Sequence, residues 1–293
     1  MKNIILDTDL YNEIDDQIAL AYVLKSKDVL NLEAVTIAPF TKGKYNTKTS
    51  IDKSYEVAKK IFKMCNEQNN EIIFKGATEY FTNDSNQTNE AVNKIIQIAK
   101  KNDKTYILSI GCITNIALAI KKEPSIINKI EVIWLGSNFL FMKNNDFNFR
   151  QDVEAVRYVL DSKVKITIIP TYPVSYGLMI SKYELESRIR NANELCNYFC
   201  DIFTDDYSTE EIRRVIWDIS TVAYMINKEW FQTMEISCPR IKEDTSFKLT
   251  KFRHKIKFVQ RLDSNKIYDD LFSKITKWGI YESKILWRYN RKK

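Results

Sequence analysis

The chain has 293 residues, of which 44% are hydrophobic and 28% are charged, and this balance excludes a disordered or fibrous protein. No apolar run reaches the roughly 18–20 residues that span a bilayer. Acidic residues follow the first apolar run too soon for a secretory signal. We therefore expect a cytoplasmic protein that makes no contact with a membrane.

Short apolar runs alternate with amphipathic stretches along most of the chain. In chain order, this pattern predicts strands at 3–6, 32–38, 71–74, 105–110, 131–135 and 165–170, and helices at 15–27, 47–67, 89–101, 114–122 and 152–160. Strands that alternate with helices of this length require crossover connections. We expect an α/β fold with a mostly parallel, doubly wound, Rossmann-like sheet and helices on both faces, formed by a single domain of residues 1–293.

The C-terminal part of the chain has a different pattern and a strong positive charge. Residues 181–227 are predicted to be largely helical, 247–259 to form a late hairpin or edge pair, and 266–277 to form a helix. Of the net charge of +7, residues 239–293 carry +10, so the remainder carries −3. A basic region can bind nucleic acid. Basic and apolar residues alternate at 252–259, however, which favours a solvated sheet face, and we expect no nucleic-acid partner.

Two further patterns bear on cofactors. Cys196 and Cys200 could share a helical face and bind a metal, but no second pair of Cys or His accompanies them. This favours ordinary core or surface thiols for all five cysteines. The chain also lacks G-x-G-x-x-G and G-x-x-x-x-G-K motifs, so a nucleotide-binding Rossmann protein is disfavoured.

Acidic side chains cluster directly behind the first predicted strand, at Asp7, Asp9, Glu13, Asp15 and Asp16. Open parallel sheets bind ligands at the carboxyl ends of their strands. Helix capping would explain Asp15 and Asp16, but it would not explain Asp7 and Asp9. Carboxylates that converge need a cation or a proton, and oxygen ligands favour Ca²⁺ or Mg²⁺ over zinc.

Four motifs, in the same chain order, resemble those of the inosine-uridine-preferring nucleoside hydrolases. They are Asp7-Thr8-Asp9…Asp15-Asp16-Gln17-Ile18-Ala19, then Ile110-Gly111-Cys112-Ile113-Thr114-Asn115-Ile116-Ala117, then Asp146-Phe147-Asn148…Asp152-Val153-Glu154-Ala155, and finally Trp217-Asp218, where the family has His-Asp. The resemblance extends over about residues 3 to 230. It implies the nucleoside hydrolase fold and calcium-dependent cleavage of the N-glycosidic bond of a ribonucleoside or related N-riboside.

The resemblance also implies residue roles. Asp9, Asp16, Asp218 and the carbonyl of Ile110 would bind Ca²⁺, and Asp9 would take a proton from a metal-bound water that attacks the anomeric carbon. The substrate would be held by Asp15, Asn148, Asp146 and Trp217. Asp146 replaces a family Glu and reaches one methylene less far. We also expect a homodimer or homotetramer.

The chain departs from the family pattern in three places. Leu10-Tyr11-Asn12-Glu13-Ile14 makes the acidic loop two residues longer, and Asn12 and Glu13 could bind the metal, contact the substrate or pad the turn. Pro39 replaces an Asn after the second strand. Trp217 replaces the His that assists the leaving base, and the single histidine, His254, is expected at the surface.

The loss of this His leaves two hypotheses open. The base half of the site could be rebuilt around aromatic surfaces, for which the candidates are Tyr11, Phe40, Phe139, Phe141, Trp217 and Tyr224. Alternatively, the protein could be a non-catalytic nucleoside- or ribose-binding protein that keeps the nucleoside hydrolase fold.

Overall fold

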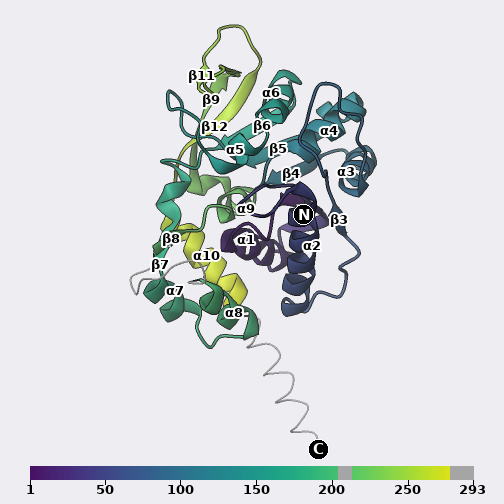
Figure 1. Cartoon of the computed structure of the whole chain (residues 1–293). Helices are drawn as coiled ribbons and strands as arrows, with labels where there is room; N and C mark the ends of the chain where they lie inside the picture. Colours follow the sequence, from purple (N-terminus) through teal and green to yellow (C-terminus); the bar gives the residue numbers. More distant parts are fainter. Residues whose placement is uncertain (204–212, 278–293) are drawn as a thin grey trace, which may run out of the picture.

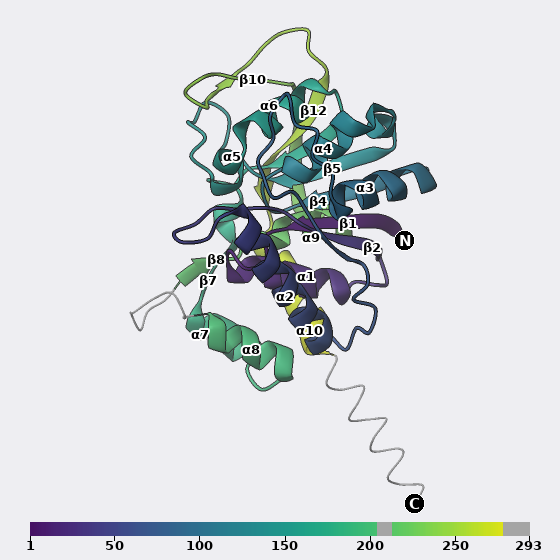
Figure 2. The same cartoon turned by 45° about the vertical axis from the view of Figure 1, so that its right-hand side comes forward.

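The computed structural model describes residues 1–203 and 213–277. Its centre is an eight-stranded sheet in the order β3-β2-β1-β4-β5-β6-β12-β9 (Figures 1 and 2). The strands in this order are β3 (Ile73–Lys75), β2 (Leu30–Ile37), β1 (Lys2–Thr8), β4 (Thr105–Ser109), β5 (Ile130–Leu135), β6 (Lys165–Ile169), β12 (Lys255–Leu262) and β9 (Phe231–Ser237). Neighbouring strands are parallel except for β12 and β9, which are antiparallel.

Helices cover both faces of the sheet, as the doubly wound fold predicts. On one face lie α1 (Ile14–Leu24), α2 (Thr47–Met64), α9 (Ile219–Ile226) and α10 (Ser264–Thr276), with α7 (Lys182–Ile189) and α8 (Glu194–Ile202) packed beside them. On the other face lie α3 (Glu90–Lys101), α4 (Thr114–Lys122) and α6 (Val153–Asp161), preceded by the short α5 (Phe147–Gln151). The expected α/β fold class is therefore confirmed.

The apolar runs form strands because both sheet faces are buried. In β1, Ile4 and Leu6 join the core beneath α1 and α2, while Ile5 between them joins the core beneath α3 and α4. Successive side chains of a strand point to opposite faces, so a strand covered on both sides needs a continuous apolar sequence. This requirement explains why the six N-terminal strands could be located from the sequence.

Residues 247–259 do not form the predicted hairpin or edge pair with one another. β12 lies between β6 and β9 and is not an edge strand, and its antiparallel partner is the unpredicted β9. The alternation itself is confirmed, because Ile256 and Phe258 are buried while Lys255 and Lys257 are exposed. Two small strand pairs were also not predicted: β10 (Arg240–Ile241) with β11 (Phe247–Lys248), and β7 (Met179–Ser181) with β8 (Arg213–Val215).

Other expectations for the second half of the chain have mixed outcomes. The helical prediction for 181–227 is confirmed at α7, α8 and α9, and the predicted helix at 266–277 corresponds to α10. Residues 204–212 and the basic segment 278–293 lie outside the described residues. The five cysteines are free and buried, and Cys65, Cys196 and Cys200 belong to one apolar core. No helix within 1–203 or 213–277 is long and apolar enough to cross a membrane.

Candidate active site

The acidic cluster lies where the direction of winding changes in the sheet. β1 and β4 are neighbours, but α1 follows β1 onto one face while α4 follows β4 onto the other. Connections that leave on opposite faces open a crevice at the carboxyl ends of the two strands. Asp9 lies just past the end of β1, and Ile110 lies just past the end of β4, where its N–H donates a 2.8 Å hydrogen bond to the carbonyl of Asp7.

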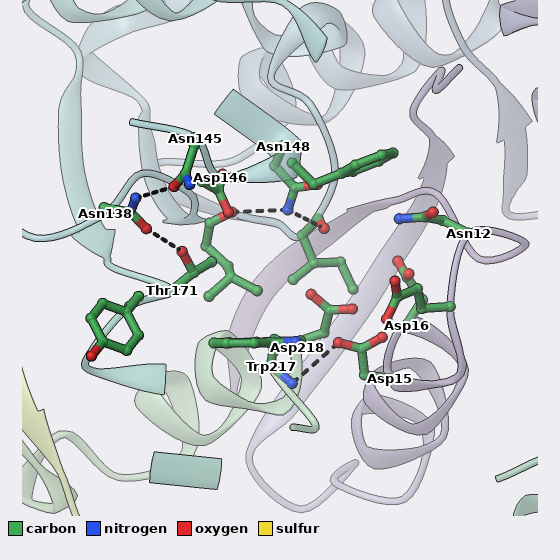
Figure 3. Close-up of a pocket in the computed structure, with 15 residues that line it drawn as sticks. Asn12, Asp15, Asp16, Asn138, Asn145, Asp146, Asn148, Thr171, Trp217 and Asp218 are labelled. Carbon is green, nitrogen blue, oxygen red and sulfur yellow. Dashed lines mark hydrogen bonds between the residues drawn. The ribbon is translucent and has the colours of Figure 1, made fainter. Parts of the chain in front are cut away.

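Three carboxylates converge in this crevice. Asp15 and Asp16 lie in the first turn of α1, and Asp218 immediately precedes α9. Each contributes a carboxylate oxygen, and these oxygens lie within 4.8 Å of one another (Figure 3). All three side chains are buried. The structure thus brings Asp218 to the N-terminal acids from about two hundred residues away, as the sequence motif predicts.

Helix capping does not account for these acids. Asp218 makes no capping hydrogen bond with its side chain. Asp15 Oδ2 accepts a 3.1 Å bond from the backbone N–H of Trp217, and Asp16 Oδ1 accepts from Thr8 Oγ1 at 2.6 Å and from the backbone N–H of Asp9 at 3.2 Å. The carboxylates of Asp15 and Asp16 are therefore held by groups that lie outside their own helix.

Asp9 is the most isolated of the acids. Its side chain is 1% exposed, and neither carboxylate oxygen has a hydrogen-bond partner among the described residues. It does not belong to the group of three carboxylates. A Cβ at Gly111 would lie 3.0 Å from Asp9 Oδ1 and 2.9 Å from the Ala38 side chain, so the glycine leaves the room that this carboxylate occupies.

Burial and mutual repulsion disfavour the ionised forms of these groups. Burial raises the pKa of Asp9, Asp15 and Asp218 well above the ordinary value of 3.8, and neighbouring carboxylates raise it further. Burial also raises the pKa of Asp16 to about 7, although the hydrogen bond from Thr8 opposes this shift. A divalent cation would offset the repulsion and the unmet hydrogen bonding of Asp9, so the residues present fit an oxygen-ligated metal ion.

Asn148 connects the end of β4 with the end of β5. Its Nδ2 donates to the carbonyl of Ile110 at 2.9 Å and to the carbonyl of Leu135 at 3.1 Å. These bonds fix the orientation of the amide and leave Oδ1 as an acceptor, and Asn148 lines the cavity (Figure 3). The carbonyl of Ile110, expected to bind the metal, is thus held by a side chain that is expected to bind the sugar.

Asp146 has a structural role that the sequence did not predict. Its Oδ1 accepts hydrogen bonds from the backbone N–H groups of Phe149, at 2.8 Å, and Ser137, at 3.1 Å, and so caps α5. Burial raises the pKa of this carboxyl, while both hydrogen bonds oppose the shift. Asp146 also lines the cavity, so capping does not exclude contact with a substrate.

A cavity of about 270 Å³ connects these groups. Its lining includes Asp15, Asp16, Ile110, Asp146, Asn148, Trp217 and Asp218, together with Asn12 and Glu13 from the longer loop. Asn138, Asn145, Thr171 and Tyr172 also line it and were not predicted. Asn138 and Thr171 lie in the loops that begin at the ends of β5 and β6, so their position shortly after buried strands was the signal that could have identified them.

Of the six aromatic residues proposed from the sequence as stacking surfaces, only Trp217 is among the described residues that line this cavity. Trp217 lines the cavity, and its ring lies 6.0 Å from that of Tyr176, which in turn lies 5.5 Å from that of Tyr172. Phe40 and Tyr224 are core residues instead. Phe139 packs against Phe258, while Phe141 is 81% exposed and Tyr11 contacts Tyr45. Of the six candidates, Trp217 therefore lies where a leaving base could stack.

His254 cannot replace the missing family histidine. It directly precedes β12, which is parallel to β6, and therefore lies at the amino edge of the sheet, opposite the acids. The His254 side chain is half-buried, so the expected surface position is confirmed only in part. Pro39, at the position of a family Asn, is buried, and its carbonyl accepts a hydrogen bond from the Cys112 thiol.

Comparisons with known proteins identify the family of the chain. The family model described as inosine-uridine preferring nucleoside hydrolase matches residues 4–269. The chain is 25% identical over 225 residues to a probable ribonucleoside hydrolase of Dictyostelium discoideum; the matched region is 67% of this chain and 65% of the relative, so the chain spans just under two thirds of that protein.

Solved structures show the same fold. A purine-preferring ribonucleoside hydrolase from Gardnerella vaginalis is similar with a TM-score of 0.76 at 18% identity, covering 95% of this chain and 99% of that one. An inosine-uridine preferring nucleoside hydrolase from Bacillus anthracis gives 0.72 at 16% identity, covering 94% and 100%. The predicted fold is confirmed, and so is the family that the sequence motifs resemble. The chain belongs to the inosine-uridine preferring nucleoside hydrolase family.

Proposed function

We propose that this protein hydrolyses the N-glycosidic bond of a ribonucleoside or related N-riboside, with Ca²⁺ held by Asp9, Asp16, Asp218 and the carbonyl of Ile110. The observation that carries the proposal is the convergence of buried carboxylates at the crevice between β1 and β4. The family is metal-dependent in general, and carboxylate and carbonyl oxygens are the ligands that Ca²⁺ prefers. The bound cation would lower the pKa of a water molecule at the site.

Asp9 is the proposed general base. Its carboxylate oxygens are buried and have no partner among the described residues, so they are available to bind the cation and to accept a proton from the attacking water. The carboxylates around it serve a second purpose. Hydrolysis passes through an oxocarbenium-like state in which the sugar gains positive charge. Negative groups that are already in place stabilise this charge without further reorganisation.

The sugar would be held by groups of fixed orientation. Asp15 is oriented by the backbone N–H of Trp217, and Asn148 by two backbone carbonyls, and each retains an oxygen that can accept a hydrogen bond from a ribose hydroxyl. Asp146 would contact the sugar at the other end of the cavity (Figure 3). The ring of Trp217 would stack on the leaving base, a role that needs no proton transfer.

The test is release of reducing sugar from a broad ribonucleoside panel, with the protein loaded with calcium or treated with a chelator. We expect turnover that requires calcium and that Asp9→Asn abolishes. Asp103→Asn is a matched control, because Asp103 is exposed and precedes β4 at the opposite edge of the sheet. Absence of turnover on every riboside would contradict the proposal. Ribose binding by calorimetry without turnover would support the non-catalytic alternative.

Assembly as a homodimer or homotetramer, cytoplasmic residence and the absence of a nucleic-acid partner stay predictions. Each can be checked with the purified protein or in cells, by its mass in solution, by fractionation and by mobility shift at low salt, where electrostatic binding to nucleic acid is strongest.

A further inference from the structure

The cavity of the candidate active site is lined by carboxylates without a cationic side chain among them. These carboxylates are those of Asp15, Asp16, Asp146 and Asp218, and the described lining contains no Lys, Arg or His. Glu13 also lines the cavity, but its charge is offset by Lys42 and Arg214, at 3.3 and 3.8 Å. One divalent cation would offset two of the four remaining charges. The cavity therefore attracts a positive group and repels a negative one.

The described lining also lacks a group that readily gives a proton to a leaving base. Its neutral polar groups are the amides of Asn12, Asn138, Asn145 and Asn148, the hydroxyls of Thr171 and Tyr172, and the indole N–H of Trp217. Such groups donate hydrogen bonds but keep their protons at neutral pH. A bound cation favours the ionised form of the carboxyl groups around it. Residues 204–212, which the structure does not describe, include no Lys, Arg or His in the sequence.

Whether a proton is needed depends on the charge of the base. Attack by water forms a bond from its oxygen to the anomeric carbon, and the proton of the water passes to Asp9. The bond from the anomeric carbon to the base breaks, and its electron pair moves to the ring nitrogen. A neutral base would leave as an anion and so needs a proton. A base whose ring carries a positive charge leaves as a neutral molecule and needs none.

The aromatic group at the cavity also suits a positive ring. Trp217 is half-buried, and its main-chain N–H is bonded to the carboxylate of Asp15. Figure 3 shows Trp217 beside Asp218 and Asp15. The face of an aromatic ring attracts cations, and that of tryptophan does so most strongly. A positive base stacked on Trp217 would therefore gain from the ring and from the carboxylates near it.

We propose that the candidate site is selective for N-ribosides whose base is a positively charged aromatic ring, of which a pyridinium riboside is the simplest example. The inference rests on the proposed function for the positions of the sugar and of the attacking water. It follows from the negative lining, from the lack of a proton donor for the base and from the exposed face of Trp217. Ordinary nucleosides, whose bases are neutral, are then poor substrates.

The first experiment compares turnover of nicotinamide riboside, which is a pyridinium cation, with that of inosine and uridine, after subtraction of hydrolysis without protein. We expect kcat/KM to be about a hundredfold or more higher for the cation, since a general acid typically contributes at least this factor to the departure of a neutral base. Similar kcat/KM for inosine would show that a group in the cavity protonates the base, and would overturn the inference.

Nicotinic acid riboside is the matched control for charge, because it has the same pyridinium nitrogen and an added carboxylate. Like charges that meet in a site disfavour binding, so we expect its kcat/KM to be about tenfold or more below that of nicotinamide riboside. Equal values for the two ribosides would show that the negative lining does not select the substrate, which the inference requires.

The second experiment measures binding without turnover, by calorimetry, with 1-methylnicotinamide as the cation and nicotinamide as its neutral partner. We expect the cation to bind more tightly, with a preference that declines as salt rises. Trp217→Leu should lower the affinity for the cation about three- to thirtyfold more than the affinity for nicotinamide. Tyr183→Leu is the control, at a tyrosine that is 83% exposed. Equal losses for both molecules in Trp217→Leu would contradict the inference.

The two experiments separate this inference from the proposed function. If no riboside is hydrolysed but the cation binds more tightly and Trp217→Leu removes the difference, the preference of the cavity is assigned correctly and the proposed function fails. If inosine, uridine and nicotinamide riboside are hydrolysed alike and binding does not depend on charge, the proposed function stands and the inference fails.

Discussion

The backbone N–H of Trp217 donates a 3.1 Å hydrogen bond to Oδ2 of Asp15, across 202 positions of the chain. The bond ties the start of α9 to the first turn of α1, and so places Asp218 beside the N-terminal acids. Because the donor is a main-chain group, this contact does not depend on which side chain occupies position 217. The metal and sugar half of the site can therefore stay intact while Trp replaces His in the base half.

Trp217→Ala should weaken binding of the base and leave binding of the sugar nearly unchanged. Stacking of a base on an aromatic ring contributes about 1–3 kcal/mol, so we expect KM for a ribonucleoside to rise by about tenfold or more. Ribose, which has no base, should keep its inhibition constant. Tyr183→Ala, at a tyrosine that is 83% exposed, is the control. A parallel loss of affinity for ribose would show that Trp217 supports the sugar half instead.

Gly111→Ala should weaken calcium binding, because the new methyl group would lie 3.0 Å from Asp9 Oδ1 and 2.9 Å from the Ala38 side chain. Overpacking of this kind costs about 1–3 kcal/mol of folding stability. Calcium titration followed by thermal unfolding measures both effects. Gly177→Ala is the matched control, since its methyl group would meet only Leu262 Cδ1 at an ordinary 3.8 Å. Similar calcium affinity for both variants would count against the position of Asp9.

Stability should fall as pH rises when calcium is absent, and much less when calcium is bound. Burial raises the pKa of Asp7 and of Asp16 from 3.8 to about 7. In this range the folded protein binds more protons than the unfolded chain, so without metal the free energy of unfolding falls as pH rises from 3.8 to about 7. Each group contributes up to about 1.4 kcal/mol per pH unit.

Calcium should remove most of this fall, because it binds the ionised carboxylates of the folded state. Urea unfolding at several pH values, with chelator and with calcium, measures the difference. Asp7→Asn separates the two groups: Asp7 is held by Thr36 and Asn115, so the variant should reduce the fall without reducing the calcium effect. A chelated protein that gains stability as pH rises through this window would refute this electrostatic account.

The sequence was sufficient to predict the parts of the molecule whose patterns are local. Strands buried on both faces appear as apolar runs, and the acids after β1 could be placed at the carboxyl edge because parallel strands end there together. The apolar run 219–226 predicted where α9 begins, and so predicted that Asp218 lies at the N-terminus of this helix. These inferences required only the order of elements and the motif residues.

Features that depend on neighbours in space could not be predicted. The alternation in β12 showed which side chains are buried, but nothing in it identified β6 and β9 as the adjacent strands. Asn138 and Thr171 follow predicted strands, but the sequence alone did not show that β5 and β6 end beside the acids. In the same way, Lys60 of α2 and Arg214 of β8 line one cavity although they are far apart in sequence.

The most direct test of the account is calcium stabilisation of Asp218→Asn, measured as the shift in unfolding temperature on adding calcium to chelated protein. Without metal, the variant should be as stable as the parent or more so, because it removes one buried carboxylate that its neighbours repel. With calcium it should gain little, since a charged ligand is lost, whereas Glu13→Gln should keep most of the gain. If calcium stabilises Asp218→Asn as strongly as the parent, the carboxylates do not hold a shared cation through Asp218, and the central claim is wrong.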